Sequence, residues 1–333
     1  MRHGSRRALL RGSGRCGRVV RGPPSARRHA VIVGFFFLFG MVVGSFLNVC
    51  ITRIPEEVSI VTPGSRCPKC GTAIKWYDNV PVVAWLWLRG KCRTCGAGIS
   101  VMYPLVELVT GLLFVTCYLE FGITQATVKW LFFLCLIVIL TVTDLRVRLL
   151  PDVVTWPGLA AGMLFSAFVP PQDAVTLLLA GFFWRHFQDV PPAGVLGVME
   201  AVLGAAFGSL LLWGVARLYK LVRKREGMGQ GDVKMMAMAG AFLGVRDTFL
   251  TILLGTVLGS VIGLAVIALM YARGAGRQVA ERASRRGLGS VKSLRWTIAS
   301  QYQLPLGTFL GIAALAVMLG FSSFAADLIP RLR

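Results

Sequence analysis

Long apolar runs alternate with short polar segments along most of this 333-residue chain. A helix needs about 20 apolar residues to cross a hydrocarbon core roughly 30 Å thick. Runs near that length predict eight membrane-spanning helices, at residues 30–51, 101–121, 127–143, 153–169, 194–216, 233–245, 248–271 and 305–324. The apolar run 174–184 is too short to span, so we expect an interfacial or re-entrant helix there. The pattern therefore predicts an all-α polytopic membrane protein.

Composition leads to the same class of protein. Hydrophobic residues make up 55% of the sequence and charged residues 15%, whereas soluble domains keep roughly a quarter of their residues charged. The mean hydropathy of +0.68 is high. An ordinary soluble protein is excluded.

The basic residues indicate the topology. The net charge is +21, but its carriers lie between the apolar runs, which argues against nucleic-acid binding. With eight spans, the loops on one side of the membrane receive 21 lysines and arginines, and the loops and C-terminal tail on the other side receive five. The N-terminal tail, with nine arginines, conflicts with this topology because it falls on the side with few basic residues. The basic side comprises the loops 52–101, 144–152, 217–232 and 272–304. Because basic loops stay in the cytoplasm, we expect these loops to be cytoplasmic and to attract anionic lipid headgroups.

The same segments define the expected domains. A basic tail at 1–28 holds nine arginines and no acid, which is typical of a disordered segment or an over-extended start. After it we expect a first transmembrane helix (29–51), a cytoplasmic loop with cysteines (52–100), a membrane-embedded core (101–324) and a tail (325–333). Within the core, we expect the basic loop 272–304 to be solvated and partly disordered.

Two Cys-x-x-Cys pairs lie in the loop 52–100, namely Cys67, Cys70, Cys92 and Cys95. Each pair can present two thiolates from one tight turn, and four thiolates suit a tetrahedral Zn²⁺ ion. Gly71 and Gly96 follow the pairs, as such turns require. The reducing cytosol argues against two structural disulfides. We predict a structural zinc site, with reduced cysteines or a redox pair as the alternative.

Two aspartates lie at the ends of predicted spans on the cytoplasmic side. Asp144 ends the third span, and Asp232 begins the sixth in Gly229-Gln230-Gly231-Asp232. The run after Asp232 has only about thirteen apolar residues, or roughly 20 Å of helix. The glycine-rich stretch before it should therefore lie in a thinned or water-lined region. Glycines at 227, 229 and 231 also permit the close approach of another backbone.

Such a pair of acids can perform chemistry. An ionisable group at bilayer depth costs about 2.5–3.5 kcal/mol and usually marks function. Two facing carboxyls share a proton, so one can act as a base toward water and the other as an acid toward a carbonyl oxygen. In the alternative interpretation both are ordinary helix-end residues, with Asp232 as an N-cap. The residues alone leave both interpretations open.

Other catalytic schemes lack their residues. The sequence has no Gly-x-Ser-x-Gly or His-Glu-x-x-His motif. Glycines from Gly34 to Gly44 are spaced for helix packing, not for phosphate binding. Two interpretations from other classes remain. One is a proton-coupled transporter that uses the aspartates as a relay, and the other is a zinc-dependent assembly scaffold without catalysis.

Five blocks, in order, resemble the type IV prepilin leader peptidase family, whose members are GxGD intramembrane aspartic proteases. These blocks are Gly44-Ser45-Phe46-Leu47-Asn48-Val49, the cysteine loop, Tyr103-Pro104-Leu105-Val106-Glu107-Leu108, Asp144 with Leu149-Leu150-Pro151-Asp152, and Glu226 to Lys234. The resemblance covers roughly residues 40–310. Thr308 departs from the pattern, because a second proline is common there.

The resemblance implies cleavage of the basic leader of prepilins or pseudopilins at the cytoplasmic face of the inner membrane. Such enzymes serve type IV pilus assembly or type II secretion, and many then methylate the new N-terminus with S-adenosylmethionine. It implies catalytic roles for Asp144 and Asp232. It also implies Zn²⁺ at the four cysteines of a loop associated with methyl transfer.

Five further residues are expected to support the site. Gly229 and Gly231 belong to the GxGD block. Asp152 is expected to start a helix, or to hold a water or a substrate amide. Lys234 is expected to orient Asp232 or to reach lipid phosphate. Glu107 is expected to serve methyl transfer or to be paired within the bundle.

Overall fold

The computed structural model describes residues 26–169, 173–184, 192–224, 229–272 and 305–321. This described part is helical and has no β-strand, only two isolated β-bridges in the cysteine loop. Its longer helices are α1 (Ala26–Arg53), α3 (Met102–Phe121), α4 (Gln125–Val147), α5 (Asp152–Ser166), α7 (Ala193–Arg223) and α8 (Gln230–Ala272). Its shorter elements are the 3-10 turns η1 (Ile54–Glu56) and η2 (Trp76–Asn79), the helices α2 (Val83–Trp87), α6 (Ala174–Phe183) and α11 (Leu306–Ala316), and the π-helical turn η4 (Val317–Phe321). The predicted all-α class is confirmed.

Five of the described helices are long and apolar enough to cross a membrane, namely α1 with η1, α3, α4, α7 and α8. Leu306–Gly320, in α11 and η4, form a shorter apolar helix. The protein is thus a multi-pass membrane protein, and the count of eight spans stays a prediction. Some expectations fall outside the described residues: those for the tails up to residue 25 and from 322, the basic loop 273–304 and Gly227.

The two largest differences from the expected helix boundaries are in α7 and α8. Helix α7 continues to Arg223, beyond the expected end at 216, because basic residues are favourable in the last turns of a helix. The two helices expected at 233–245 and 248–271 form one element, α8, which breaks at Gly244 with φ 75° and ψ −176°. Glycine adopts this conformation without steric cost.

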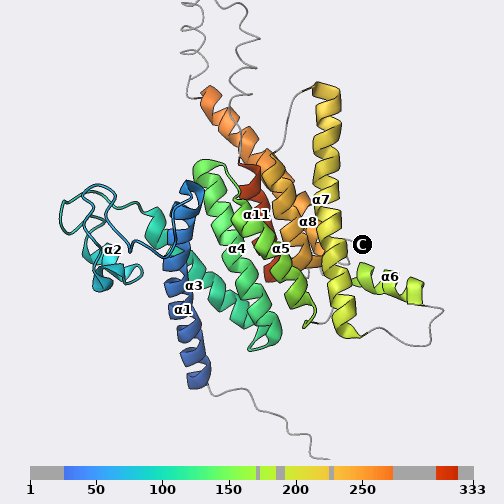
Figure 1. The fold of residues 1–333 in the computed structure, drawn as a ribbon, viewed down its shortest axis with the longest axis horizontal. Coiled ribbons are helices and arrows are strands. Elements are labelled where there is room, and N and C mark those ends of the chain that lie inside the picture. Colours follow the sequence, from blue (N-terminus) through green and yellow to red (C-terminus); the bar gives the residue numbers. More distant parts are fainter. Residues whose placement is uncertain (1–25, 170–172, 185–191, 225–228, 273–304, 322–333) are drawn as a thin grey trace, which may run out of the picture.

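Figure 1 shows α4, α5, α7, α8 and α11 packed as a bundle, with α1 and α3 beside it carrying the cysteine loop. Small residues bring α1 and α3 together. A methyl group added at Gly40 would lie 2.8 Å from Gly111 Cα, and one added at Gly44 would lie 2.8 Å from Glu107 Cα. The predicted packing role is confirmed at Gly40 and Gly44. At Gly34 an added methyl group would have no atom within 4 Å, so this glycine is not part of the contact.

Helices α7 and α8 approach even more closely. A Cβ added at Gly204 of α7 would fall on the carbonyl of Gly240 of α8, and a Cβ added at Gly240 would fall on the carbonyl of Gly204. In lipid, helices associate through such close packing because apolar surface gains little by leaving the hydrocarbon. This contact fixes α8 against its neighbour.

One buried apolar cluster holds the elements of the site. It includes Phe133 and Leu140 of α4, Met235 and Phe242 of α8, and Leu310 of α11. The rings of Phe133 and Phe242 lie 4.9 Å apart. This packing places the C-terminal end of α4 next to the N-terminal ends of α8 and α11, so polar residues at those ends converge.

Candidate active site and metal centre

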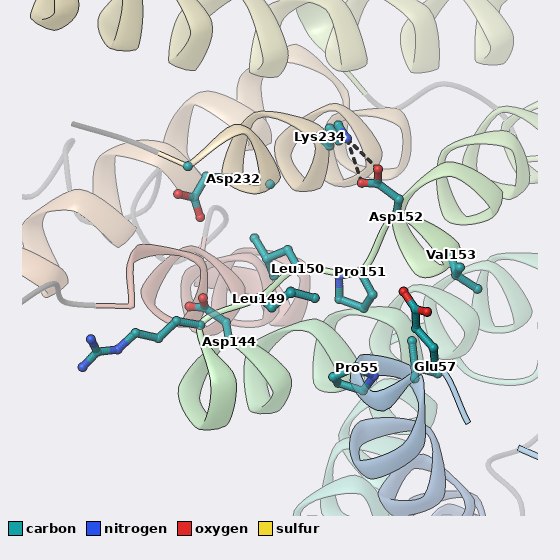
Figure 2. A pocket seen from close by; sticks show the side chains of 14 residues that line it. Pro55, Glu57, Asp144, Leu149, Leu150, Pro151, Asp152, Val153, Asp232 and Lys234 are labelled. Carbon is teal, nitrogen blue, oxygen red and sulfur yellow. Dashed lines mark hydrogen bonds and ion pairs between the residues drawn. The ribbon is translucent and has the colours of Figure 1, made fainter. Parts of the chain in front are cut away.

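A cavity of about 550 Å³ opens where α4 ends and where α5 and α8 begin, with the residues after α1 forming one wall (Figure 2). Both predicted catalytic aspartates line it, and so do Asp152 and Lys234. Its walls also carry apolar side chains, among them Ile54, Leu149, Leu150 and Val153. The cavity therefore combines carboxyl groups with an apolar surface.

Asp144 lies in the last turn of α4 and is buried, with 6% of its surface exposed. Its Oδ2 accepts two hydrogen bonds from Thr308, one from the backbone N–H at 2.6 Å and one from the hydroxyl at 2.9 Å. Thr308 belongs to the first turn of α11, where backbone N–H groups have no partner within the helix. The carboxylate of one helix thus satisfies a free donor of another.

Asp232 lies in the first turn of α8 and is also buried. A methyl group added at Gly307 would lie 3.1 Å from Asp144 Oδ2 and 3.1 Å from Asp232 Oδ1. Figure 2 shows the two carboxyl groups pointing toward one another across the cavity. The structure therefore brings together two aspartates that are far apart in the sequence.

The motif glycines lie beside this pair. The position of a Cβ at Gly231 is 3.0 Å from Leu150 Cβ, so a larger residue would crowd the segment between α4 and α5. At Gly229 the same position is 3.6 Å from Asp232 Oδ2, an ordinary contact distance. Gly231 thus permits a close approach, as expected, but the group that approaches it is the Leu150 side chain and not the backbone of another segment.

Asp152 and Lys234 form an ion pair at the edge of the cavity. The Lys234 ammonium donates to both oxygens of Asp152, at 2.8 and 2.7 Å (Figure 2). Asp152 begins α5 directly after Pro151, as expected. Lys234 is therefore bonded to Asp152 and not to Asp232, and this ion pair joins the start of α5 to the first turns of α8.

Glu107 lies away from the aspartates, at the base of the cysteine loop. This buried residue of α3 accepts a hydrogen bond from the Val82 N–H at 2.8 Å. Val82 has φ 59°, a conformation unusual for a β-branched residue. Nearby, the Asn48 amide donates to the Tyr103 carbonyl at 3.0 Å. Glu107 thus fixes the loop to the membrane helices.

The four cysteines predicted as ligands converge in the loop. Their Sγ atoms all lie within 4.8 Å of one another. Cys67 and Cys95 are 3.8 Å apart, and Cys70 and Cys92 are 4.0 Å apart. A tetrahedral ion with Zn–S bonds of about 2.3 Å needs sulfurs about 3.8 Å apart. The donor set therefore fits one tetrahedral Zn²⁺ ion.

The two cysteine turns have the same backbone geometry. The Gly71 N–H donates to the Cys67 carbonyl and the Gly96 N–H to the Cys92 carbonyl, both at 2.9 Å. Both glycines have φ 69°, the left-handed region that favours glycine. This repetition matches the turns expected from the sequence.

Polar contacts adjust the charges in this loop. The side-chain hydrogen bond with Thr72 lowers the pKa of the Cys70 thiol to about 6, which favours the thiolate that binds metal. Arg93, between the second pair of cysteines, forms an ion pair with Asp78 at 2.6 Å. The hydrogen bond from Arg93 lowers the pKa of Asp78. The second turn is thereby tied to η2.

Sequence reasoning missed two residues of the aspartate site. Thr308 stood out only as a departure from a pattern, and Gly307 did not stand out at all. Their contacts join α4 to α11 across more than 160 residues, which no local pattern reveals. One usable signal was Pro305, because proline before an apolar run marks a helix start with free N–H groups.

Comparisons with known proteins agree with this geometry. Residues 38–121 match the bacterial peptidase A24 N-terminal domain, and residues 130–264 match the type IV leader peptidase family. The prepilin leader peptidase/N-methyltransferase of Myxococcus xanthus is 40% identical over 233 residues, which cover 70% of this chain and 62% of that protein. The match thus spans less than two thirds of that relative.

Two further relatives carry the same name. The Aeromonas salmonicida protein is 36% identical over 258 residues, covering 70% of this chain and 80% of its own length. The Neisseria gonorrhoeae protein is 32% identical over 264 residues, covering 71% and 82%. No solved structure matches the chain. With these relatives and both matching domains, the chain belongs to the type IV leader peptidase family.

Proposed function

We propose that this protein is a prepilin leader peptidase that also methylates the N-terminus it creates. Its substrates would be type IV prepilins or the pseudopilins of type II secretion. The names of its relatives support the reaction class. One structural observation supports the mechanism: two buried aspartates from different helices meet at Gly307, at an open cavity.

The proposed cleavage needs no covalent intermediate. One carboxylate removes a proton from a water molecule, whose oxygen forms a bond to the carbonyl carbon of the scissile peptide. The other carboxyl gives its proton to the carbonyl oxygen. The resulting tetrahedral diol then collapses, the C–N bond breaks, and the leaving nitrogen takes a proton. The two aspartates end with one shared proton, as they began.

The cavity suits a peptide at the junction of a polar leader and an apolar helix. Its apolar residues, such as Leu149 and Val153, can contact the apolar part. Glu57 at its edge supplies negative charge toward a basic leader. We place this cavity and the cysteine loop at the cytoplasmic face, on the distribution of basic residues between the spans.

The cysteine loop is proposed to bind one structural Zn²⁺ ion. Four sulfur ligands leave no open position for water, so the metal stabilises the loop and takes no part in hydrolysis. S-adenosylmethionine would supply the methyl group that replaces a proton on the new N-terminal amine. Glu107 would keep the loop in place on the bundle during both reactions.

The testing experiment is cleavage of a membrane-embedded prepilin by the wild type, Asp144→Asn and Asp232→Asn. We expect the wild type to cut before the apolar helix and each variant to lose at least about 100-fold in rate, since each removes an acid–base group. Asp78→Asn, in the cysteine loop, is the control and should cleave normally. The mass of the new first residue reports methylation.

Equal cleavage by the wild type and both variants would refute the two-aspartate mechanism. If folded, zinc-loaded wild type cleaves no prepilin, the peptidase proposal fails. Proton flux in vesicles without cleavage would then support a transporter. Loss of assembly in Cys67→Ser alone would support a scaffold.

A further inference from the structure

Thr308 distinguishes the two aspartates from one another. Both of its donors, the backbone N–H and the hydroxyl, reach the same oxygen, Asp144 Oδ2. Thr308 is itself buried, with 5% of its surface exposed, so water does not compete for these hydrogen bonds. Among the described residues, no side-chain hydroxyl or ammonium makes such a hydrogen bond to Asp232. Asp232 has a backbone hydrogen bond with Gly229. The two carboxyls therefore differ in the donors around them, because in the described part of the chain only Asp144 has a side-chain hydroxyl in addition to a backbone N–H.

The hydroxyl of Thr308 has one hydrogen and two acceptors in reach. The Thr141 carbonyl lies at 3.3 Å and Asp144 Oδ2 at 2.9 Å. The shorter contact is to the group that can carry a charge, and charge-assisted hydrogen bonds are the stronger ones. With the N–H also donating, Oδ2 accepts two hydrogen bonds from Thr308.

We propose that Thr308 is a positioning residue that holds Asp144 as the unprotonated member of the pair, so that Asp144 is the base and Asp232 carries the shared proton. This inference rests on the proposed function. Asp144 then removes the proton from water through its other oxygen, Oδ1. Asp232 gives its proton to the carbonyl oxygen of the substrate, and the roles reverse when the diol collapses.

Asp144 also shares its cavity with other charged and titratable side chains. The titratable and charged side chains that share its cavity are Asp232, Asp152, Lys234, Glu57 and Arg148. Lys234 is occupied by Asp152. Helix α11 contains no titratable residue between 306 and 316. The contribution of α11 to Asp144 is thus the pair of donors on Thr308.

The test compares prepilin cleavage by the wild type, Thr308→Val, Thr308→Ala and Thr308→Ser across a range of pH. Valine and alanine keep the N–H and remove the hydroxyl, so kcat/KM should fall about tenfold, as for a lost hydrogen bond to a charged group. The acidic limb of the pH profile should move to higher pH in both. Serine keeps both donors and should behave like the wild type.

Thr251→Val is the matched control. Thr251 is a fully buried threonine of α8 whose hydroxyl donates to the Asp247 carbonyl in its own helix. This variant should leave the pH profile unchanged. If Thr308→Ser loses as much activity as Thr308→Val, the side chain acts by packing and the proposal is overturned.

An unchanged pH profile in folded Thr308→Val or Thr308→Ala would also overturn it. Either result leaves the peptidase function standing, because the wild type still cleaves. Absence of cleavage by the wild type is a different outcome, which refutes the proposed function and this role of Thr308 together.

Discussion

Asp144 and Asp232 are ionisable side chains inside an apolar bundle, where each carboxylate costs about 2.5–3.5 kcal/mol on insertion scales. Their local contacts offset part of that cost. Asp144 accepts two hydrogen bonds from Thr308, and Asp232 has a backbone hydrogen bond with Gly229. The contacts that lower the free-energy cost of burying these two carboxyl groups also fix the positions of the groups in the cavity.

Gly307 sets how closely the two carboxyls approach. In Gly307→Ala the new methyl group would stand 3.1 Å from an oxygen of each aspartate, so both side chains must shift by a few tenths of an ångström. We expect prepilin cleavage to fall at least tenfold, because small displacements of reacting groups are costly. Cleavage kinetics on purified, folded protein measure this.

Gly34→Ala is the control for this substitution, since a methyl group there has no atom within 4 Å. It should cleave at the wild-type rate. A Gly307→Ala variant as active as Gly34→Ala would show that the carboxyls have more room than the structure indicates.

Single residues differ in how far the sequence could predict them. Local motifs predict Asp144, Asp232 and the four cysteines. In the structure the two aspartates lie close to one another, and so do the four cysteines. Lys234 was predicted beside the site, but its partner is Asp152 because that carboxylate lies within reach of its ammonium. Thr308 needed the fold, because its role depends on where α11 begins relative to α4.

At the scale of elements, the cysteine loop contrasts with the helices around it. Its two turns have few apolar contacts, and several large apolar side chains in it are exposed, including Trp76 and Trp87. A segment of this kind cannot be held by a hydrophobic core. We therefore expect the proposed Zn²⁺ ion to contribute much of its stability.

Zinc should leave this loop on acidification. The pKa of Cys70 is lowered to about 6, so its thiolate is present above that pH and is lost as the pH falls through it. Bound zinc competes with protons for the thiolates, so we expect zinc release to begin below about pH 6. Metal content after dialysis at decreasing pH measures it, starting from one zinc per chain.

Two variants complete that measurement. Cys67→Ser removes one ligand and should lose zinc already at neutral pH. Cys50→Ser removes a buried free thiol of α1 and should retain it. Zinc retained by Cys67→Ser, or a protein purified without zinc, would contradict the predicted site.

The helices show what hydrophobic pattern can and cannot predict. Apolar runs located every long helix, because burying backbone polar groups in lipid requires helical hydrogen bonding. Ends were harder to predict. Arg217 and Lys220 indicated a loop, yet α7 continues through both since they extend into solvent from a helix as readily as from a coil. The break in α8 falls at Gly244. Glu200 and Asp173 pack so closely there that a residue with a side chain would not fit without displacing them.

The two parts that match known families, residues 38–121 and 130–264, belong to one molecule in which the cysteine loop joins the membrane helices through polar contacts. The hydrogen bond from the Val82 N–H to Glu107 connects the start of the short helix α2 to α3. Because Glu107 is buried, its removal leaves the Val82 N–H without its partner. The position of the loop on the bundle should depend on this carboxylate.

In Glu107→Ala the loop should loosen while the metal site stays formed. Hydrogen exchange of the Val82 amide should become at least about tenfold faster, since about 1.4 kcal/mol corresponds to one factor of ten and a hydrogen bond to a charged group contributes about 1.5–3 kcal/mol. Mass spectrometry of the exchanged protein measures this. Glu120→Ala, an exposed glutamate of the same helix, is the control. Equal protection in both variants would show that Glu107 does not hold the loop.

One wall of the aspartate cavity comes from outside the part of the chain that carries the aspartates. Ile54, Pro55 and Glu57, which follow α1, line the same space as Asp144 and Asp232. A shortened chain that began at α4 would keep both acids but would expose them along one flank. Because this wall is shared, we expect a chain that lacks the residues before α4 to form an incomplete cavity, and two halves produced separately to restore it only when they associate.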